Sequence, residues 1–136
     1  MIRMRTHAVA KAAYEKVELR RSLPDPKKYG ALAHKLPGMI LQNGLAQATG
    51  FLLAKGAKAA EHIQLLDDLN AVLRAGGTLD KPNGEELHRA IIAAGVTETL
   101  KLTRHALEAS AWIKRYVQGV LRVGPTGNTD LEAPNP

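Results

Sequence analysis

Residues 35–56 read KLPGMILQNGLAQATGFLLAKG, and this stretch decides how the rest of the chain is arranged. Only the lysines at its two ends carry formal charge, while isoleucine, leucine and phenylalanine recur between them. A helix that is apolar nearly all round is normally buried. We therefore expect a helix from Pro37 to about Lys55 at the centre of the fold, with amphipathic helices packed around it.

The composition of the whole chain favours an all-α fold. Alanine and leucine dominate the apolar residues, and the 136 residues include only one Trp, three Tyr and one Phe. Alanine and leucine are strong helix formers, and a chain of this length usually forms one domain. We expect a single compact helical bundle of about five to six helices over residues 1–123. The segment 124–136 lacks periodicity and is rich in turn formers, so we expect a disordered C-terminal tail.

The spacing of apolar residues and the capping residues place the surrounding helices. Asp25 is a natural N-cap with Pro26 at the first helical position, and Pro37 is expected to separate that short helix from the central one. Asn83 followed by Glu86 resembles a capping box. Asp67 and Asp68 are adjacent, so they cannot share a helix face, and we expect both in solvent. The expected helices cover residues 5–21, 26–35, 37–55, 57–75, 84–94 and 97–122.

No set of residues in the sequence points to catalysis or to a bound cofactor. The chain has no cysteine, and no two of its five histidines stand three or four residues apart. Without such spacing no helix presents a ready-made pair of metal ligands. We expect no catalytic residue, metal site, cofactor or small-molecule substrate. A metal-dependent nuclease, with histidines brought together by folding, is the enzyme alternative.

The only stretch long and apolar enough to suggest a membrane span, residues 37–54, contains three amides and three glycines. These polar and flexible residues argue against a transmembrane helix. The N-terminus shows no uncharged apolar segment of the kind found in secretory signals. We therefore expect a cytoplasmic protein without a membrane partner.

Positive charge is concentrated towards the two ends of the part of the sequence that is expected to fold. The formal net charge is +6, and residues 1–35 hold nine Lys and Arg against three Asp and Glu. Such clustering indicates a polyanionic partner, for which nucleic acid is the first expectation and an anionic membrane surface the second. Point charges of this kind bind phosphates without reading sequence. The candidate RNA contacts are Lys16, Arg20, Arg21, Lys27, Lys28 and Lys35 across the first two helices, and Lys101, Arg104, Lys114 and Arg115 on the last.

Three amides of the central stretch, Gln42, Asn43 and Gln47, and the single Trp112 are candidate contacts with other subunits. A buried amide without a partner costs about 1–3 kcal/mol. The amides are therefore either paired with a neighbouring helix or exposed on an open face that meets a ligand or another subunit. Trp112 borders the side of the last helix that carries the basic residues. It either closes the edge of the core or offers its ring to a base or a protein partner.

The block LPGMILQNGLAQ at residues 36–47, followed by Phe51 and Leu52, resembles a signature of the small subunit of type III-B CRISPR RNA-guided effector complexes, the Cmr complexes. Tyr29 lies at a suitable distance upstream. The segments TETLKLTRHAL at 97–107 and WIKRY at 112–116 are similar to the closing helix of that family. The resemblance extends from about Met4 to Val123.

This resemblance implies a non-catalytic, all-α subunit that lines a ribonucleoprotein filament in antiviral defence. Its implied partners are other Cmr subunits, further copies of itself, CRISPR RNA and target RNA, and target cleavage would belong to a neighbouring subunit. The alternative is a purely structural protein–protein spacer without direct RNA contact.

Overall fold

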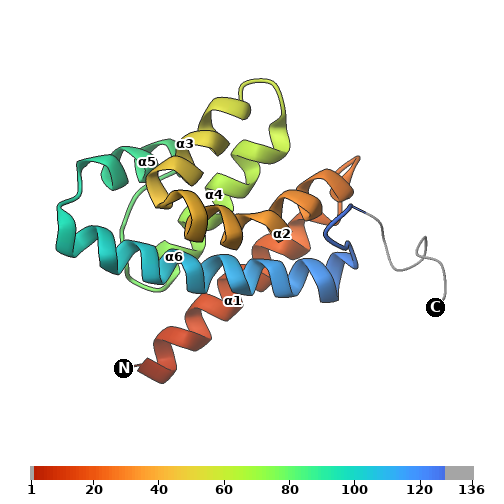
Figure 1. Ribbon diagram of the computed structural model, residues 1–136. Coiled ribbons are helices and arrows are strands. Elements are labelled where there is room, and N and C mark those ends of the chain that lie inside the picture. The colour runs from red at the N-terminus through yellow and green to blue at the C-terminus, as the bar shows by residue number, and fades with distance from the viewer. Residues whose placement is uncertain (1, 128–136) are drawn as a thin grey trace.

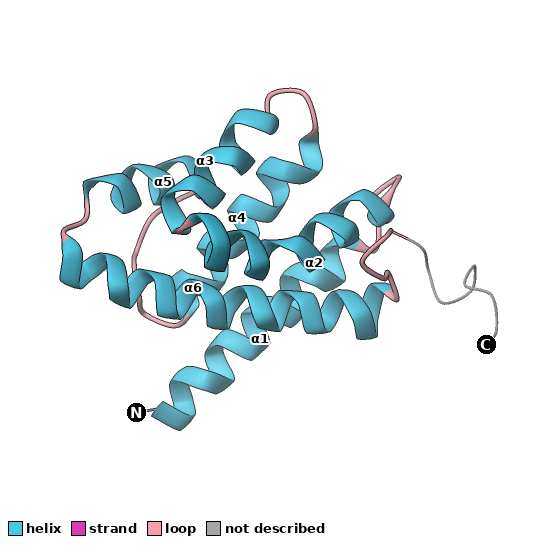
Figure 2. Cartoon of the chain, in the orientation of Figure 1, coloured by secondary structure: helices cyan, strands magenta, loops and turns pink. Residues whose placement is uncertain are grey.

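A computed structural model describes residues 2–127, with side chains from Arg5 onward. Within this range the chain is helical and contains no strand (Figures 1 and 2). The expected compact all-α bundle of five to six helices is confirmed. The elements are α1 (Ile2–Arg20), α2 (Pro26–Asn43), α3 (Leu45–Lys55), α4 (Ala60–Ala75), α5 (Gly84–Ala93), α6 (Val96–Tyr116) and the π-helical turn η1 (Val117–Leu121).

Helix α4 occupies the centre of the bundle and packs against each of the five other α-helices. Its leucines at 65, 66, 69 and 73 are buried together with Val72. The 3-4 spacing of these residues buries a broad stripe, which is the usual pattern of a helix enclosed on several sides. The expectation that residues 37–55 form the central helix is therefore wrong.

Helix α2 continues through Pro37, where the sequence predicted a boundary. An interior proline removes one backbone hydrogen bond and costs about 3 kcal/mol. The helix tolerates this cost because its buried face runs unbroken across the proline. That face consists of Tyr29, Leu32, Ala33, Leu36 and Ile40, all buried at helical spacing.

The bend within the apolar stretch lies at Gly44, between α2 and α3. Gly44 has φ 88° and ψ 157°, a conformation that residues with a Cβ rarely adopt. The bend leaves part of the stretch outside the core, since Leu41 is 71% exposed and Phe51 is 40% exposed. Only the faces containing Ile40, Leu45 and Leu52 are buried.

The predicted caps are confirmed. The Asp25 carboxylate accepts a hydrogen bond from the Lys27 amide at 3.3 Å, and the Asn83 side chain accepts one from the Glu86 amide at 2.9 Å. These bonds satisfy backbone donors that a helix leaves unpaired in its first turn. Helices α2 and α5 therefore begin where the sequence places them.

The chain beyond α6 packs back onto α2. His34 Nε2 donates to the Val123 carbonyl oxygen at 2.8 Å, and both residues are buried. Val123 rests against Gly30, where a Cβ would stand 2.5 Å from the valine Cγ1. Residues 124–127 form a turn closed by a hydrogen bond between the Gly127 amide and the Gly124 carbonyl. The rest of the predicted tail, residues 128–136, lies outside the described residues.

Two glycines of α2 give a matched test of this packing. Gly38 has no atom within 4 Å of a built Cβ, so Gly38→Ala should raise the free energy of unfolding by about 1 kcal/mol through helix propensity. Gly30→Ala should lower it by about 1–3 kcal/mol, because the methyl group overlaps Val123. Urea denaturation followed by circular dichroism measures both. Equal stabilisation by the two substitutions would contradict the docking of Val123 on α2.

Candidate nucleic-acid interface

The ten basic residues predicted to contact RNA lie on or directly beside three helices, α1, α2 and α6. The zone expected to span the first two helices is divided between separate surface hollows. Lys16 and Arg20 line one hollow together with the acidic side chains of Asp67 and Asp68 on α4. Lysines of α2 line others, described below, so the α1 and α2 charges do not form one patch.

Arg20 is held by an ion pair inside the fold. Its Nε donates to Asp68 Oδ2 at 2.9 Å, and its Nη2 donates to Asp68 Oδ1 at 2.6 Å. The Tyr29 hydroxyl donates to the same carboxylate at 2.6 Å. Asp68 is 1% exposed, so the expectation that it lies in solvent is wrong. A guanidinium held in a two-bond geometry by a buried carboxylate has little left to offer a phosphate, and Arg20 is a structural residue.

The protonation states in this cluster follow from burial. Desolvation raises the pKa of Asp68, and the hydrogen bonds from Arg20 and Tyr29 offset part of that rise. The hydrogen bond to Asp68 raises the pKa of Arg20 in turn. Burial, reinforced by the Asp68 charge, raises the pKa of Tyr29 well above 10.0. Tyr29 therefore keeps its proton and donates to the carboxylate.

The other α1 candidates have acidic neighbours. The exposed guanidinium of Arg21 lies 3.3 Å from the Glu18 carboxylate. Lys16 is half-buried and shares its hollow with Asp67 and Asp68. These carboxylates would repel a phosphate that approached either cation. The α1 residues are therefore the weakest of the predicted RNA contacts.

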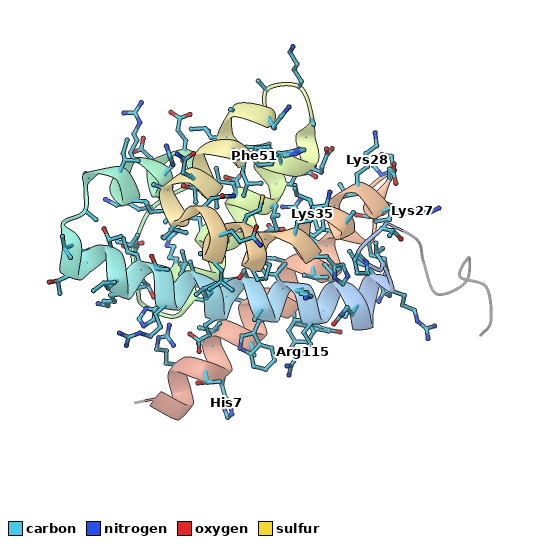
Figure 3. All side chains as sticks on the ribbon, in the orientation of Figure 1. His7, Lys27, Lys28, Lys35, Phe51 and Arg115 are labelled. Atoms are coloured by element: carbon cyan, nitrogen blue, oxygen red, sulfur yellow. The ribbon has the colours of Figure 1, made fainter. Side chains whose placement is uncertain are left out.

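The α2 lysines are better placed. Lys28 and Lys35 are exposed, and within residues 5–127 neither forms an ion pair. Both line a hollow that also contains Met39 and Phe51. Figure 3 shows Lys27, Lys28 and Lys35 on α2 and Phe51 on the adjacent α3.

The three amides lie on an open face. Gln42, Asn43 and Gln47 are all exposed, and they line a second hollow with Met39, Ala48 and Phe51. Of the two arrangements that the sequence left open, the structure therefore has the exposed one. Because Met39 and Phe51 line both hollows, the amide hollow continues directly into the lysine hollow.

One of the α6 candidates, Arg115, lies beside a partly buried aromatic cluster. Trp112 stacks on Tyr116 with ring centroids 5.7 Å apart, and the Arg115 guanidinium lies 5.3 Å from the Trp112 centroid. Trp112 also packs against the hydrophobic core, so it closes the core edge. Lys101 and Arg104 are exposed, Lys114 is half-buried and Arg115 is exposed. In the view of Figure 3, Arg115 lies just below α6 and apart from the labelled α2 lysines.

A family model described as CRISPR-associated protein (Cas_Cmr5) matches residues 5–120. The chain belongs to the Cmr5 family. The resemblance read from residues 36–52 and from the last helix is thereby confirmed.

Individual Cmr5 relatives agree with the family match along most of their length. The CRISPR system Cmr subunit Cmr5 of Thermus thermophilus is 36% identical over 120 residues, which cover 88% of this chain and 98% of the relative. The X-ray crystal structure of a CRISPR-associated Cmr5 family protein from Thermus thermophilus matches with a TM-score of 0.76 and 33% identity. That match covers 86% of this chain and 96% of the other. The helical arrangement described above is therefore the Cmr5 fold.

The described part of the chain has neither a helix suited to a membrane nor a cluster of metal-ligating side chains. None of its helices combines the length and hydropathy needed to cross a membrane. Within residues 2–127, no three His, Asp or Glu side chains converge in a way that could hold a metal ion.

The structural role of Arg20 can be tested by its removal. Arg20→Met leaves the buried Asp68 carboxylate without its cation, which should lower the free energy of unfolding by about 3 kcal/mol at neutral pH. Arg21→Met, one residue away and exposed, should change it by less than about 0.5 kcal/mol. Urea denaturation of both variants provides the measurement.

The pH dependence of the Arg20→Met variant follows from the raised pKa of Asp68. Removing the cation raises this pKa further, so the folded state retains a proton that the unfolded state releases. The stability lost at neutral pH should therefore be recovered as the pH falls towards the unfolded value of 3.8. A loss that stays constant from neutral pH down to that value would show that Asp68 does not cause it.

Proposed function

We propose that this chain is the small subunit of a type III-B Cmr complex and that it helps to hold CRISPR RNA and target RNA without taking part in cleavage. The observation that carries this proposal is the family match over residues 5–120. The Thermus thermophilus relative that the chain covers almost completely is described as a Cmr subunit. Partners would be other Cmr subunits, including further copies of this chain, and the complex would act in the cytoplasm.

The surface chemistry supports direct contact with RNA. Lys28 and Lys35 on α2, with Lys101, Arg104 and Arg115 on α6, present exposed positive charge on two faces of the bundle. Cations on a helical surface neutralise phosphates irrespective of base sequence. A subunit that lines a filament needs this property, because the guide sequence that it holds varies.

A purely structural spacer is the second candidate, and one observation favours it. Several large apolar side chains are exposed: Leu41 at 71%, Ile92 at 63%, Val96 at 80% and Leu100 at 64%. Exposed apolar side chains that lie next to one another are typical of surfaces that other proteins cover, and Val96 and Leu100 stand one turn apart on α6. As a spacer, the chain would use these residues to contact neighbouring subunits, and its basic faces would meet acidic protein surfaces.

Charge reversal separates the two candidates. A variant with Lys27→Glu, Lys28→Glu, Lys114→Glu and Arg115→Glu should bind RNA more weakly than the unchanged chain, with a shallower dependence of affinity on salt. Filter binding at low salt, on the isolated chain and on the assembled complex, measures this. Lys11→Glu, an exposed reversal outside the candidate set, should have little effect. Unchanged RNA affinity of the complex after the four reversals would support the spacer.

The non-catalytic part of the proposal has its own test. The purified chain should leave end-labelled RNA intact when it is incubated with magnesium or manganese ions. Gel electrophoresis of the RNA checks this outcome. Cleavage that persists through purification and stops when a chelator is added would contradict the proposal and favour a metal-dependent nuclease.

A further inference from the structure

One face of α2 carries a continuous series of accessible side chains. Lys28, Ala31, Lys35, Met39 and Gln42 follow one another at intervals of three or four residues, so they share one side of the helix. At 1.5 Å per residue this series extends over about 21 Å. We name it, together with Phe51 of α3, the α2 track.

Three adjoining hollows follow the α2 track. The first is lined by Lys27, Lys28 and Ala31 beside the turn at 124–127. The second contains Lys28, Lys35, Met39 and Phe51. The third contains Met39, Phe51 and the three amides at 42, 43 and 47. Since neighbouring hollows share lining residues, an extended ligand can pass from one to the next along the helix.

The chemical character changes along the α2 track. Cations stand at the amino end, a thioether and an aromatic ring lie in the middle, and amide groups stand at the carboxyl end. Phe51 reaches the track because the chain bends at Gly44 and brings α3 back beside α2. The ring meets His62 edge-on, with centroids 5.5 Å apart, and is still 40% exposed.

We infer that the α2 track binds a single-stranded segment of RNA, with phosphates on Lys28 and Lys35 and one unpaired base on the ring of Phe51. Single strands are held by a cationic groove combined with aromatic side chains on which bases stack. The amides of Gln42, Asn43 and Gln47 add donors and acceptors for base edges. This inference rests on the proposed function and names the site within it.

The exposed ring of Phe51 favours a single strand at this position. A base must be unstacked to lie on Phe51, and bases inside a duplex are already stacked on their neighbours. The Trp112 ring on α6 is less suitable for stacking on a base, because it already stacks on Tyr116 and the Arg115 guanidinium lies over it. Two carboxylates oppose binding. Asp25 lines the first hollow, and Glu61 lines the middle one, where its carboxylate lies 3.1 Å from His62 Nδ1.

The first test separates stacking from packing at Phe51. Fluorescence anisotropy with a labelled oligouridine should show that Phe51→Leu weakens binding by roughly fivefold or more, because leucine keeps much of the apolar volume but offers no ring to a base. Phe51→Tyr should bind like the unchanged chain. Leu41→Gln, an exposed apolar position of α2 outside the track, is the matched control and should also leave affinity unchanged. Equal affinity of the Leu and Tyr variants would overturn the stacking role.

The second test uses the salt dependence of the same binding. Replacing Lys28 and Lys35 by Gln should reduce the slope of log affinity against log salt by about 1.4, the value for two phosphate contacts on a single strand. Phe51→Leu should weaken binding without changing the slope, because stacking releases no counterions. Glu61→Gln should tighten binding by removing a charge that repels phosphate. An unchanged slope in the double lysine variant would overturn the placement of the phosphates.

These measurements distinguish failure of the α2 track from failure of the proposed function. If the unchanged chain binds no RNA, alone or in the assembled complex, the proposed function itself fails. If the track variants bind RNA normally while Lys114→Glu and Arg115→Glu abolish binding, the function stands and the track is wrong. If the track variants keep RNA affinity but no longer assemble with the other subunits, the face is a protein contact, which also overturns the inference.

Discussion

Asp68 joins three helices of the bundle through one buried carboxylate. It lies on α4 and accepts hydrogen bonds from Arg20 of α1 and Tyr29 of α2. A buried charge is tolerated only when its partners replace the water that it has lost, so the register of α1 and α2 against α4 is fixed by the need to bring these partners together. This constraint also places the rest of α2, including the face that carries Lys28 and Lys35.

The sequence predicted the parts of the fold that depend on local signals. Composition identified the all-α class, while helical spacing and capping residues identified most helix boundaries, including the starts of α2 and α5. The sequence did not reveal that α2 continues through Pro37, because the cost of a proline is local whereas the buried face that offsets it extends from Tyr29 to Ile40. Either the proline or a glycine could have ended the helix, and the positive φ at Gly44 identifies the actual bend. The sequence also did not identify the central helix, which is α4, because this depends on the contacts that α4 makes with the five other α-helices.

Residue type predicted the surroundings of the candidate site residues less well than it predicted the fold. A sequence shows that Arg20 is a cation but cannot show that a buried carboxylate 48 positions away already holds it. The expectation for Asp68 was wrong for a related reason, because its charge suggested a position in solvent although it is 1% exposed. Phe51 was assigned to the core because it belongs to the least charged stretch of the chain. A ring placed next to two exposed lysines could be recognised only once the bend at Gly44 had set α3 beside α2.

The bond between His34 and the Val123 carbonyl joins residues 89 positions apart. Forming a contact of such long sequence separation requires the entropy cost of closing the intervening loop to be overcome. Helix α2 therefore gains its final side-chain environment only when the segment after α6 has docked. Once docked, that segment makes local unwinding at the amino end of α2 difficult without wider loss of structure. The lysines at this end of the helix thus occupy a surface that is rigid as long as the whole bundle remains folded.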